Sequence, residues 1–481
     1  MNWTDLNLIP AMPEIVLLTA LCAVLLVDLW LPDEKRGITA GLAILGVLAA
    51  AVFQVALWPG EPVETFNAMF VLDGMSYVAK LAVYAVLLVL FVVSRGYLKA
   101  RQIYKGEFYS LTMFALLGMC VMVSANHFLT LYIGLELLSL SLYALIALRR
   151  EDIRASEAAL KYFVLGALAS GLLLYGISMI YGATGSLFLP EVLMAGVGQS
   201  ANPWLLKLGL VFVVVAVAFK LGAVPFHMWV PDVYHGSSTA VTALVGTAPK
   251  IAAAVFAFRI LVTGLGALHA DWVPMLNMLA LASLLVGNLA AVVQTNIKRM
   301  LAYSTVSHMG FVLLAFMGGK YGFSAALYYA LTYALMALTG FGVLMLLSRE
   351  GRDCEEIADL SGLNQRHPWY AFLMLLVMFS MAGIPPLAGF YAKFSVLKAL
   401  VGQGFVWPAV FAVVMSLIGA FYYLRVVKVM YMDESAEPAQ ALAMCVGGRI
   451  VLSACALALL LFGLMPSLLM DWCVYALAKT F

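Results

Sequence analysis

The chain has 481 residues, of which 64% are hydrophobic and only 11% are charged, and its net charge is +2. A soluble protein of this size needs a polar surface, so the composition excludes a soluble globular protein. The six cysteines form no CxxC pair and no glycine-rich nucleotide fingerprint occurs. We therefore expect no iron–sulfur, zinc, disulfide, flavin or NAD site, and thus no cofactor, in this chain. We also expect no nucleic-acid partner.

Apolar segments of about 20 residues recur along the chain, and each is long enough to cross about 30 Å of hydrocarbon. They are too long and too uniformly apolar for barrel strands, whereas a helix satisfies its own backbone hydrogen bonds in lipid. The sequence therefore predicts an all-α polytopic membrane protein with about fourteen transmembrane helices. We expect these helices at residues 12–31, 38–58, 74–94, 108–124, 126–148, 157–181, 205–226, 240–264, 272–293, 300–318, 322–348, 368–403, 407–431 and 447–470.

Lysine and arginine concentrate in alternate loops between these segments. Clear examples are Lys35, Arg36, Arg95, Lys99, Arg101, Lys105, Arg149, Arg150, Arg154, Arg352 and Arg366. Loops rich in lysine and arginine face the cytoplasm. An even number of spans then places both termini on the opposite side of the membrane.

Two short motifs recur in the same order. AALKY at 158–162 returns as AALYY at 325–329, and Ala-Val-Pro at 223–225 returns as Gly-Ile-Pro at 383–385. Each step covers five predicted helices, and an odd step reverses the direction of the chain, which predicts two inverted five-helix repeats. We expect three N-terminal helices, two five-helix units and a fourteenth helix. The corresponding predicted boundaries are 1–105, 106–265, 266–435 and 436–481.

Proline interrupts two of the predicted helices, at Pro225 and at the pair Pro385 and Pro386. Proline removes a backbone donor and clashes with the preceding turn, and the freed backbone needs other partners inside a bilayer. Interrupted helices at matching positions of two repeats indicate an ion pathway, although simple proline kinks would leave the same pattern. Lysines close to both breaks favour the pathway.

Four ionisable residues lie deep inside the predicted helices: Glu136, Lys220, Lys250 and Lys393. An isolated charge there costs at least about 2.5–3.5 kcal/mol, so each must be paired, hydrated or neutral. Ion pairs that only lock helices together are the structural alternative, but one acid cannot neutralise three lysines. Because burial disfavours the charged form, some of these lysines should be neutral part of the time. Such a lysine is a reversible proton carrier.

Six further residues are secondary candidates for a proton relay. Lys161 is expected either to extend to the interface or to pair with Glu136. A neutral histidine can relay protons between waters, or simply form a hydrogen bond between helices. Lys298 is expected mainly to anchor its helix at the cytoplasmic surface, and Glu14 to lie exposed at the interface. The secondary candidates are Lys161, His227, His235, Lys298, Tyr303 and His308.

Two stretches carry a family resemblance. Residues 219–232, FKLGAVPFHMWVPD, followed by AVTAL at 240–244 and by Lys250, resemble the core motif of the antiporter-like family. That family comprises the large pumping subunits of respiratory complex I and the multi-subunit cation/proton antiporters. Residues 383–394, GIPPLAGFYAKF, resemble its N-type branch, whereas M-type members carry a glutamate near the position of Lys393. The resemblance covers essentially the whole chain and implies inverted repeats with Glu136, Lys220, Lys250 and Lys393 on the central axis.

The resemblance also implies a function. NADH oxidation and quinone reduction would occur in partner subunits that hold NADH, FMN, iron–sulfur clusters and quinone, while this chain moves protons across a bacterial inner membrane with periplasmic termini. The implied partners are the lipid bilayer and the M-, L-, K-, J-, A- and H-type membrane subunits. Two alternatives stay open: a subunit of a cation/proton antiporter or membrane-bound hydrogenase, and a scaffold that has lost pumping.

Overall fold

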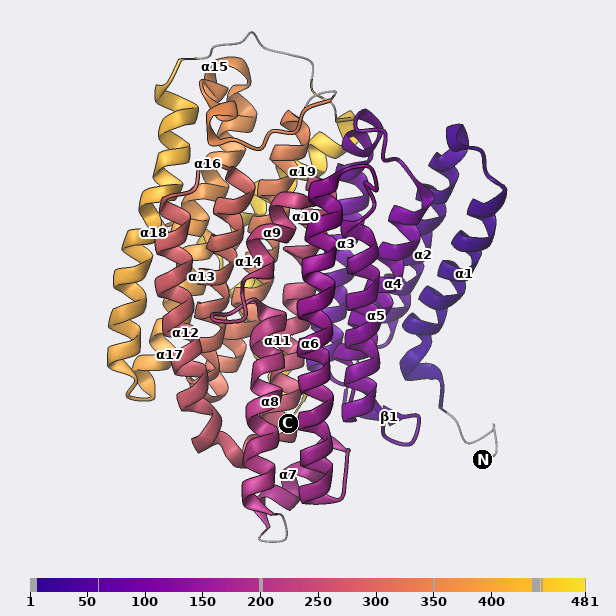
Figure 1. Ribbon diagram of the computed structural model, residues 1–481, viewed down its shortest axis with the longest axis vertical. Helices are drawn as coiled ribbons and strands as arrows, with labels where there is room; N and C mark the ends of the chain where they lie inside the picture. The colour runs from indigo at the N-terminus through magenta and orange to yellow at the C-terminus, as the bar shows by residue number, and fades with distance from the viewer. Residues whose placement is uncertain are drawn as a thin grey trace.

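The computed structural model describes residues 7–58, 60–198, 202–348, 351–434, 442 and 444–480. It is a bundle of helices that run along the long dimension of the molecule (Figure 1). Among the described residues, twelve helices are long and apolar enough to cross a membrane. The other two predicted spans are helical as well: α13 (Ile297–Phe316), and the broken pair α16 (Pro368–Ala382) and α17 (Ala388–Gly402). The predicted all-α polytopic fold is confirmed.

The N-terminal region consists of three long helices and a short hairpin. They are α1 (Met12–Trp30), α2 (Arg36–Ala56), β1 (Val63–Thr65), β2 (Phe70–Leu72) and α3 (Gly74–Ala100). The two strands are antiparallel, with Val63 opposite Leu72. A capping box starts α3, because the side chains of Asp73 and Ser76 accept from each other's backbone N–H groups. This cap fixes the residue at which the third span begins.

The next helices form the first predicted unit. They are α4 (Gly106–Val123), α5 (Phe128–Ile146), α6 (Ile153–Thr184), α7 (Leu189–Val197), α8 (Pro203–Leu221), α9 (Trp229–Gly236), α10 (Thr239–Val245) and α11 (Ala248–Phe258). The pair α8 and α9 is the predicted broken helix. Gly222 ends α8 with a φ of 81°, a conformation that glycine adopts without strain, and Pro225 follows three residues later.

The second predicted unit repeats this arrangement. It contains α12 (His269–Val292), α13, α14 (Gly319–Leu347), α15 (Leu363–Arg366), α16, α17 and α18 (Val406–Met432). Gly383 ends α16 with a φ of 86°, just before the proline pair. Equivalent helices are neighbours in both units: α4 packs on α5 as α12 does on α13, and α6 packs on α8 and α9 as α14 does on α16 and α17.

The two broken helices run in opposite directions. In Figure 1, α8 lies below α9, whereas α16 lies above α17. Opposite directions are expected for inverted units. The predicted boundaries after residues 105 and 265 stay predictions, and the boundary after residue 435 lies outside the described residues.

The C-terminal segment differs from the prediction of one helix over 447–470. Helix α19 (Val446–Leu464) ends before Pro466, and a further short helix, α20 (Ser467–Ala478), packs against α3 and α14. The carbonyl of Lys479 accepts from the N–H of Gly74 at 3.3 Å, so this segment covers the start of α3. Helix α1 begins and α20 ends at the same end of the bundle (Figure 1).

The centre of the bundle is formed by α10, α11 and α14. The span Thr239–Gly264 is 100% buried, whereas only 33% of the corresponding window is buried in α6 or α18. The outer helices therefore present apolar side chains to lipid. At one end of the bundle, a polar cavity lined by Arg101, Arg149 and Arg352 (the polar vestibule) brings together three of the predicted positive loops.

Candidate functional site

Lys220 and Glu136 are close neighbours across α5 and α8. Lys220 lies in the last turn of α8, is buried, and its Nζ donates to Ser139 Oγ on α5 at 2.7 Å. Glu136 lies three residues before Ser139, on the same face of α5, and accepts a hydrogen bond from Ser170 on α6. Helix α5 therefore places the carboxylate within one turn of the contact with Lys220. The partner of each charged group is a serine hydroxyl.

Lys250, near the start of α11, caps the first helix break. It is 1% exposed. Its Nζ donates to the carbonyl of Leu221 at 3.0 Å and lies 4.9 Å from the centre of the Trp229 ring. Leu221 is the last residue of α8, so its carbonyl is one of those that a helix end leaves without an intrahelical partner. Lys250 thus reaches the backbone one residue from Lys220.

Lys393 occupies the equivalent position at the second break. From α17, its Nζ donates to the carbonyl of Ala382 at 2.9 Å and to Ser416 Oγ on α18 at 2.7 Å. Ala382 is the last residue of α16, as Leu221 is of α8. The ring centre of Phe311 lies 5.5 Å from the amine. In each broken helix, the last carbonyl of the first half therefore accepts a hydrogen bond from a lysine amine. The two lysines come from different helices of their units.

The three lysines have neutral partners only. Among the described residues, no carboxylate oxygen lies within 4.0 Å of the amine of Lys220, Lys250 or Lys393. Hydroxyl and carbonyl oxygens can accept from an ammonium group or from a neutral amine. A change of protonation therefore does not leave a directly paired carboxylate stranded. This arrangement suits groups that gain and lose protons.

His308 lies in a buried network of hydroxyl groups. Its Nδ1 is 2.7 Å from Tyr329 Oη and its Nε2 is 3.1 Å from Tyr423 Oη. One turn earlier on α13, Thr305 lies 2.6 Å from Tyr333 Oη and donates to Tyr234 Oη on α9 at 3.5 Å. These hydrogen bonds form two groups, one around His308 and one around Thr305, which meet where the rings of His308 and Tyr333 lie 5.1 Å apart. Together the two groups span α9 of the first unit and α13, α14 and α18 of the second.

The other predicted histidine and tyrosine positions are spread around the first break. His227 and Tyr303 are half-buried with ring centres 6.5 Å apart. His235 lies in the wall of the polar vestibule. Neither histidine touches the three lysine amines through any hydrogen bond among the described residues. Their relay role stays a prediction.

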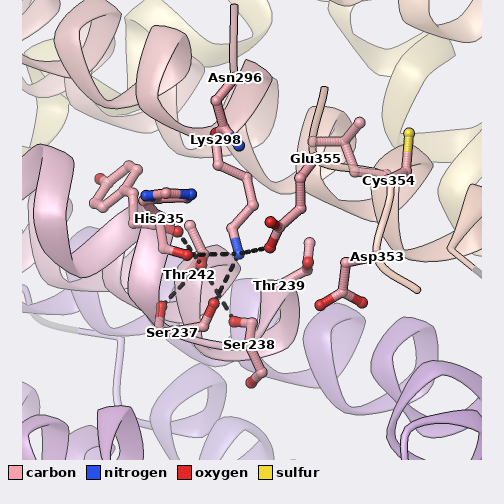
Figure 2. Close-up of polar contacts among 12 residues, drawn as sticks. His235, Ser237, Ser238, Thr239, Thr242, Asn296, Lys298, Asp353, Cys354 and Glu355 are labelled. Atoms are coloured by element: carbon pink, nitrogen blue, oxygen red, sulfur yellow. Dashed lines mark hydrogen bonds and ion pairs between the residues drawn. The ribbon is translucent and has the colours of Figure 1, made fainter. Parts of the chain in front are cut away.

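Lys298 is not the surface anchor that the sequence predicts. Its side chain is 0% exposed, and its amine forms an ion pair with Glu355 at 3.2 Å (Figure 2). The amine also donates to the carbonyls of Ser237 at 2.7 Å and His235 at 3.4 Å. The sequence pattern missed the pairing with Glu355 because this residue comes from a loop between α14 and α15, which is hydrogen-bonded to the start of α13.

Lys161 pairs with acids other than Glu136, so that predicted pairing is wrong. Its amine lies 2.7 Å from Glu157, one turn away on α6, and 2.9 Å from Asp232 on α9, and its side chain is 45% exposed. A neighbour at i,i+4 is always within reach on a helix. The alternative of an exposed position agrees with the structure.

Buried ion pairs in the N-terminal region were missed by the sequence reasoning. Lys80 Nζ lies 2.5 Å from Glu14, and both side chains are nearly inaccessible, so the predicted interfacial exposure of Glu14 is wrong. Arg259 donates to both carboxylate oxygens of Asp73, at 2.7 and 2.8 Å. Lys80 stands inside an apolar run as Lys220 does, so the same criterion could have found it. The count of one acid and three lysines inside the predicted helices therefore left out Lys80 and its partner Glu14.

No metal centre is apparent in the described parts of the chain, because no three histidine, cysteine, aspartate or glutamate side chains are grouped there as ligands. The predicted lack of a cofactor is not tested by this observation.

Sequence comparison places the chain beside a known family. Residues 125–419 match the family described as "NADH:quinone oxidoreductase/Mrp antiporter, TM". The NADH-quinone oxidoreductase subunit N of Neisseria gonorrhoeae is 66% identical over 480 residues. The match covers 100% of this chain and 100% of the relative. The protein of the same name from Laribacter hongkongensis is 58% identical, with 100% of this chain and 99% of the relative covered.

Solved structures have the same fold. A chain of respiratory complex I from Thermus thermophilus with bound aureothin is 33% identical, with a TM-score of 0.81 over 95% of this chain and 98% of that one. A chain of the Mrp complex from Dietzia has a TM-score of 0.83 at 23% identity, over 98% of this chain and 97% of that one. The second likeness concerns the fold alone.

Proposed function

The chain belongs to the NADH:quinone oxidoreductase/Mrp antiporter family, and from that premise we propose that it is a proton-translocating subunit of a membrane-bound NADH:quinone oxidoreductase. The relatives at 66% and 58% identity carry the name of that complex, which favours it over an antiporter or a hydrogenase. The match covers 100% and 99% of the length of these two relatives, which favours a shared role.

One observation carries the proposal: the amines of Lys220 and Lys250, which are buried, and of Lys393, which is partly buried, donate to hydroxyl and carbonyl oxygens, and no described carboxylate lies beside them. A lysine that serves only to hold helices together needs a counter-charge to offset its desolvation. These three lie at or beside the helix breaks, where freed backbone carbonyls and polar side chains replace hydrocarbon. They are the proton carriers in this proposal.

The transport cycle assigns a role to each deep residue. Electron transfer from NADH to quinone takes place in partner subunits, which hold FMN and the iron–sulfur clusters. That energy changes the electrostatics around Glu136, which biases the protonation of Lys220 one helix away. A proton then moves along Lys220, Lys250 and intervening waters, through the network of His308, to Lys393.

The membrane orientation follows from the positive loops. The polar vestibule, with its arginines, faces the cytoplasm, and the end where α1 begins and α20 ends faces the periplasm of a bacterial inner membrane. The partners are the M-, L-, K-, J-, A- and H-type membrane subunits and the lipid bilayer.

Replacing Lys250 by methionine tests the function. Methionine is flexible and has similar length but cannot carry a proton, so NADH-driven acidification of inverted vesicles, normalised to assembled complex, should fall on the order of tenfold or more. Lys207→Met is the matched control, because Lys207 is 47% exposed and pairs with Asp271 at one end of α8. The control should pump normally.

Normal pumping by an assembled Lys250→Met complex would support the scaffold alternative. The antiporter alternative makes a different prediction: proton movement would require a counter-cation such as Na⁺ and would not require NADH. Vesicles with choline as the only external cation distinguish the two.

A further inference from the structure

The polar vestibule leads to the ion pair between Lys298 and Glu355. The cavity has a volume of about 270 Å³ and is lined by charged side chains, among them Arg154, Asp152 and Asp359. That volume holds several water molecules, and the lining offers each of them polar partners. The carboxylate of Glu355 is 25% exposed and forms part of the lining, whereas the amine of Lys298 is 0% exposed. Glu355 therefore separates vestibule water from a buried lysine.

The backbone holds Glu355 in this position. The N–H of Ile297, next to Lys298, donates to the carbonyl of Glu355 at 2.7 Å, and the N–H of Ile357 donates to the carbonyl of Thr295 at 2.9 Å. These two bonds tie the loop to the start of α13 on both sides of the ion pair. The carboxylate is thus fixed beside the amine by hydrogen bonds that do not involve either side chain.

Serine and threonine residues lie close to the amine of Lys298. Figure 2 shows Ser237, Ser238, Thr239 and Thr242 near the end of the lysine side chain, with Thr239 on the same side as Glu355. Ser238 and Thr239 are 3% and 0% exposed; the Ser238 hydroxyl has no hydrogen-bond partner among the described residues, and the Thr239 hydroxyl lies beside Tyr97. A buried hydroxyl without a protein partner is usually satisfied by ordered water. A water at the Ser238 hydroxyl can therefore take a proton from Lys298.

We propose that Glu355 collects the pumped proton from the polar vestibule and passes it to Lys298. In the ion-paired state Lys298 is an ammonium and Glu355 a carboxylate. The ammonium gives one proton to a water at Ser238 and becomes an amine. Glu355 takes one proton from a hydronium in the vestibule, and its O–H then transfers that proton to the amine. One proton has arrived, one has moved inward, and the ion pair is restored.

This inference rests on the proposed function and adds to it the group that loads the pathway. The sequence pattern gives Lys298 as a secondary relay candidate that is expected mainly to anchor its helix, and it does not single out Glu355. The structure assigns the pair to the pathway because it spans the boundary between a hydrated cavity and the buried hydroxyls.

The variant Glu355→Gln tests the inference in vesicles that contain the whole assembled complex. Glutamine keeps the shape and the acceptor oxygen but cannot take up and release a proton, so NADH-driven acidification per assembled complex should fall on the order of tenfold. Glu356→Gln is the matched control, since it removes one charge from the next residue of the same loop, which is exposed and does not contact Lys298. The control should pump at the wild-type rate.

The double variant Glu355→Gln with Lys298→Gln separates proton transfer from charge balance. Removing both charges leaves no stranded ammonium, so a purely structural pair predicts that assembly and pumping recover. The relay predicts assembly with pumping still reduced to the level of the single variant. Recovered pumping in the double variant, or undiminished pumping in Glu355→Gln, overturns the inference.

The Lys250→Met variant, measured in parallel, identifies which idea has failed. Loss of pumping in Lys250→Met together with normal pumping in Glu355→Gln leaves the proposed function standing and removes Glu355 from it. Normal pumping in both assembled variants means that this chain does not conduct the protons.

Discussion

Two sets of basic side chains lie inside the bundle, and their partners differ. In and beside the N-terminal region, Lys80 is paired with Glu14 and Arg259 with Asp73, each at 2.7 Å or less. On the central axis, Lys220 and Lys393 meet only hydroxyls and carbonyls. Lys80, Arg259 and Lys220 are buried and Lys393 is partly buried, so depth alone does not separate the two sets.

The two sets differ in the electrostatic cost of removing a proton from the basic side chain. Loss of a proton from one member of a tight pair strands the charge of the other, which is strongly unfavourable in a low-dielectric interior. A lysine among neutral oxygens has no such penalty. The N-terminal pairs join helices distant in sequence, and we expect them to act on stability, whereas the axial lysines lie at the helix breaks and are the proton carriers of the proposed function. Lys298 combines both features, because it is ion-paired and its partner Glu355 lines the polar vestibule.

The largest expected effect is on stability, from Asp73→Asn. The change leaves the guanidinium of Arg259 buried without a counter-charge, which costs about 3–5 kcal/mol. We expect little chain in the assembled complex on native gels, while the complexes that do form pump normally. Asp152→Asn is the control, because its pair with Arg149 is 27–29% exposed and such pairs contribute about 1 kcal/mol or less. Loss of pumping in fully assembled Asp73→Asn complexes would contradict the division into two sets.

A smaller effect, on transport, is expected from Glu136→Gln. Glutamine can still accept from Ser170, so the complex should assemble. The lost charge removes an electrostatic bias on Lys220 of at least about 1 kcal/mol, and the lysine then releases its proton too readily. We expect NADH-driven acidification of inverted vesicles, per assembled complex, to fall roughly fivefold. If coupled turnover and pumping are normal, Glu136 is a packing residue.

The smallest effect is expected from Lys161→Ala. This amine is 45% exposed and its partners Glu157 and Asp232 are 59% and 31% exposed, so solvent screens the interaction. Assembly and pumping should each change by less than about twofold. A large loss of pumping with normal assembly would move Lys161 from the exposed pairs to the axial set, and Asp232→Asn would then show whether the pair or the lysine matters.

The sequence by itself determined the class of the protein and the course of the chain. Fourteen predicted segments correspond to helices or to a broken pair, because the length and apolarity of a span are local properties that a bilayer imposes on consecutive residues. The breaks at Pro225 and at Pro385 and Pro386 were predicted for the same reason, since proline acts on its own turn of helix. The short α20 was missed because Pro466 divides an otherwise continuous apolar run.

Only the tertiary structure decided which buried charges are paired. The apolar surroundings of Lys80 and Lys220 look alike along the chain, yet one amine meets Glu14 and the other Ser139. Likewise the loop that carries Glu355 reaches Lys298 only when α13 and α14 are packed. Burial follows from neighbouring residues in sequence, but the counter-charge comes from another helix or loop. The free energy of a buried charge depends on that counter-charge, so the chemical role of each lysine is set by the packing of the whole bundle.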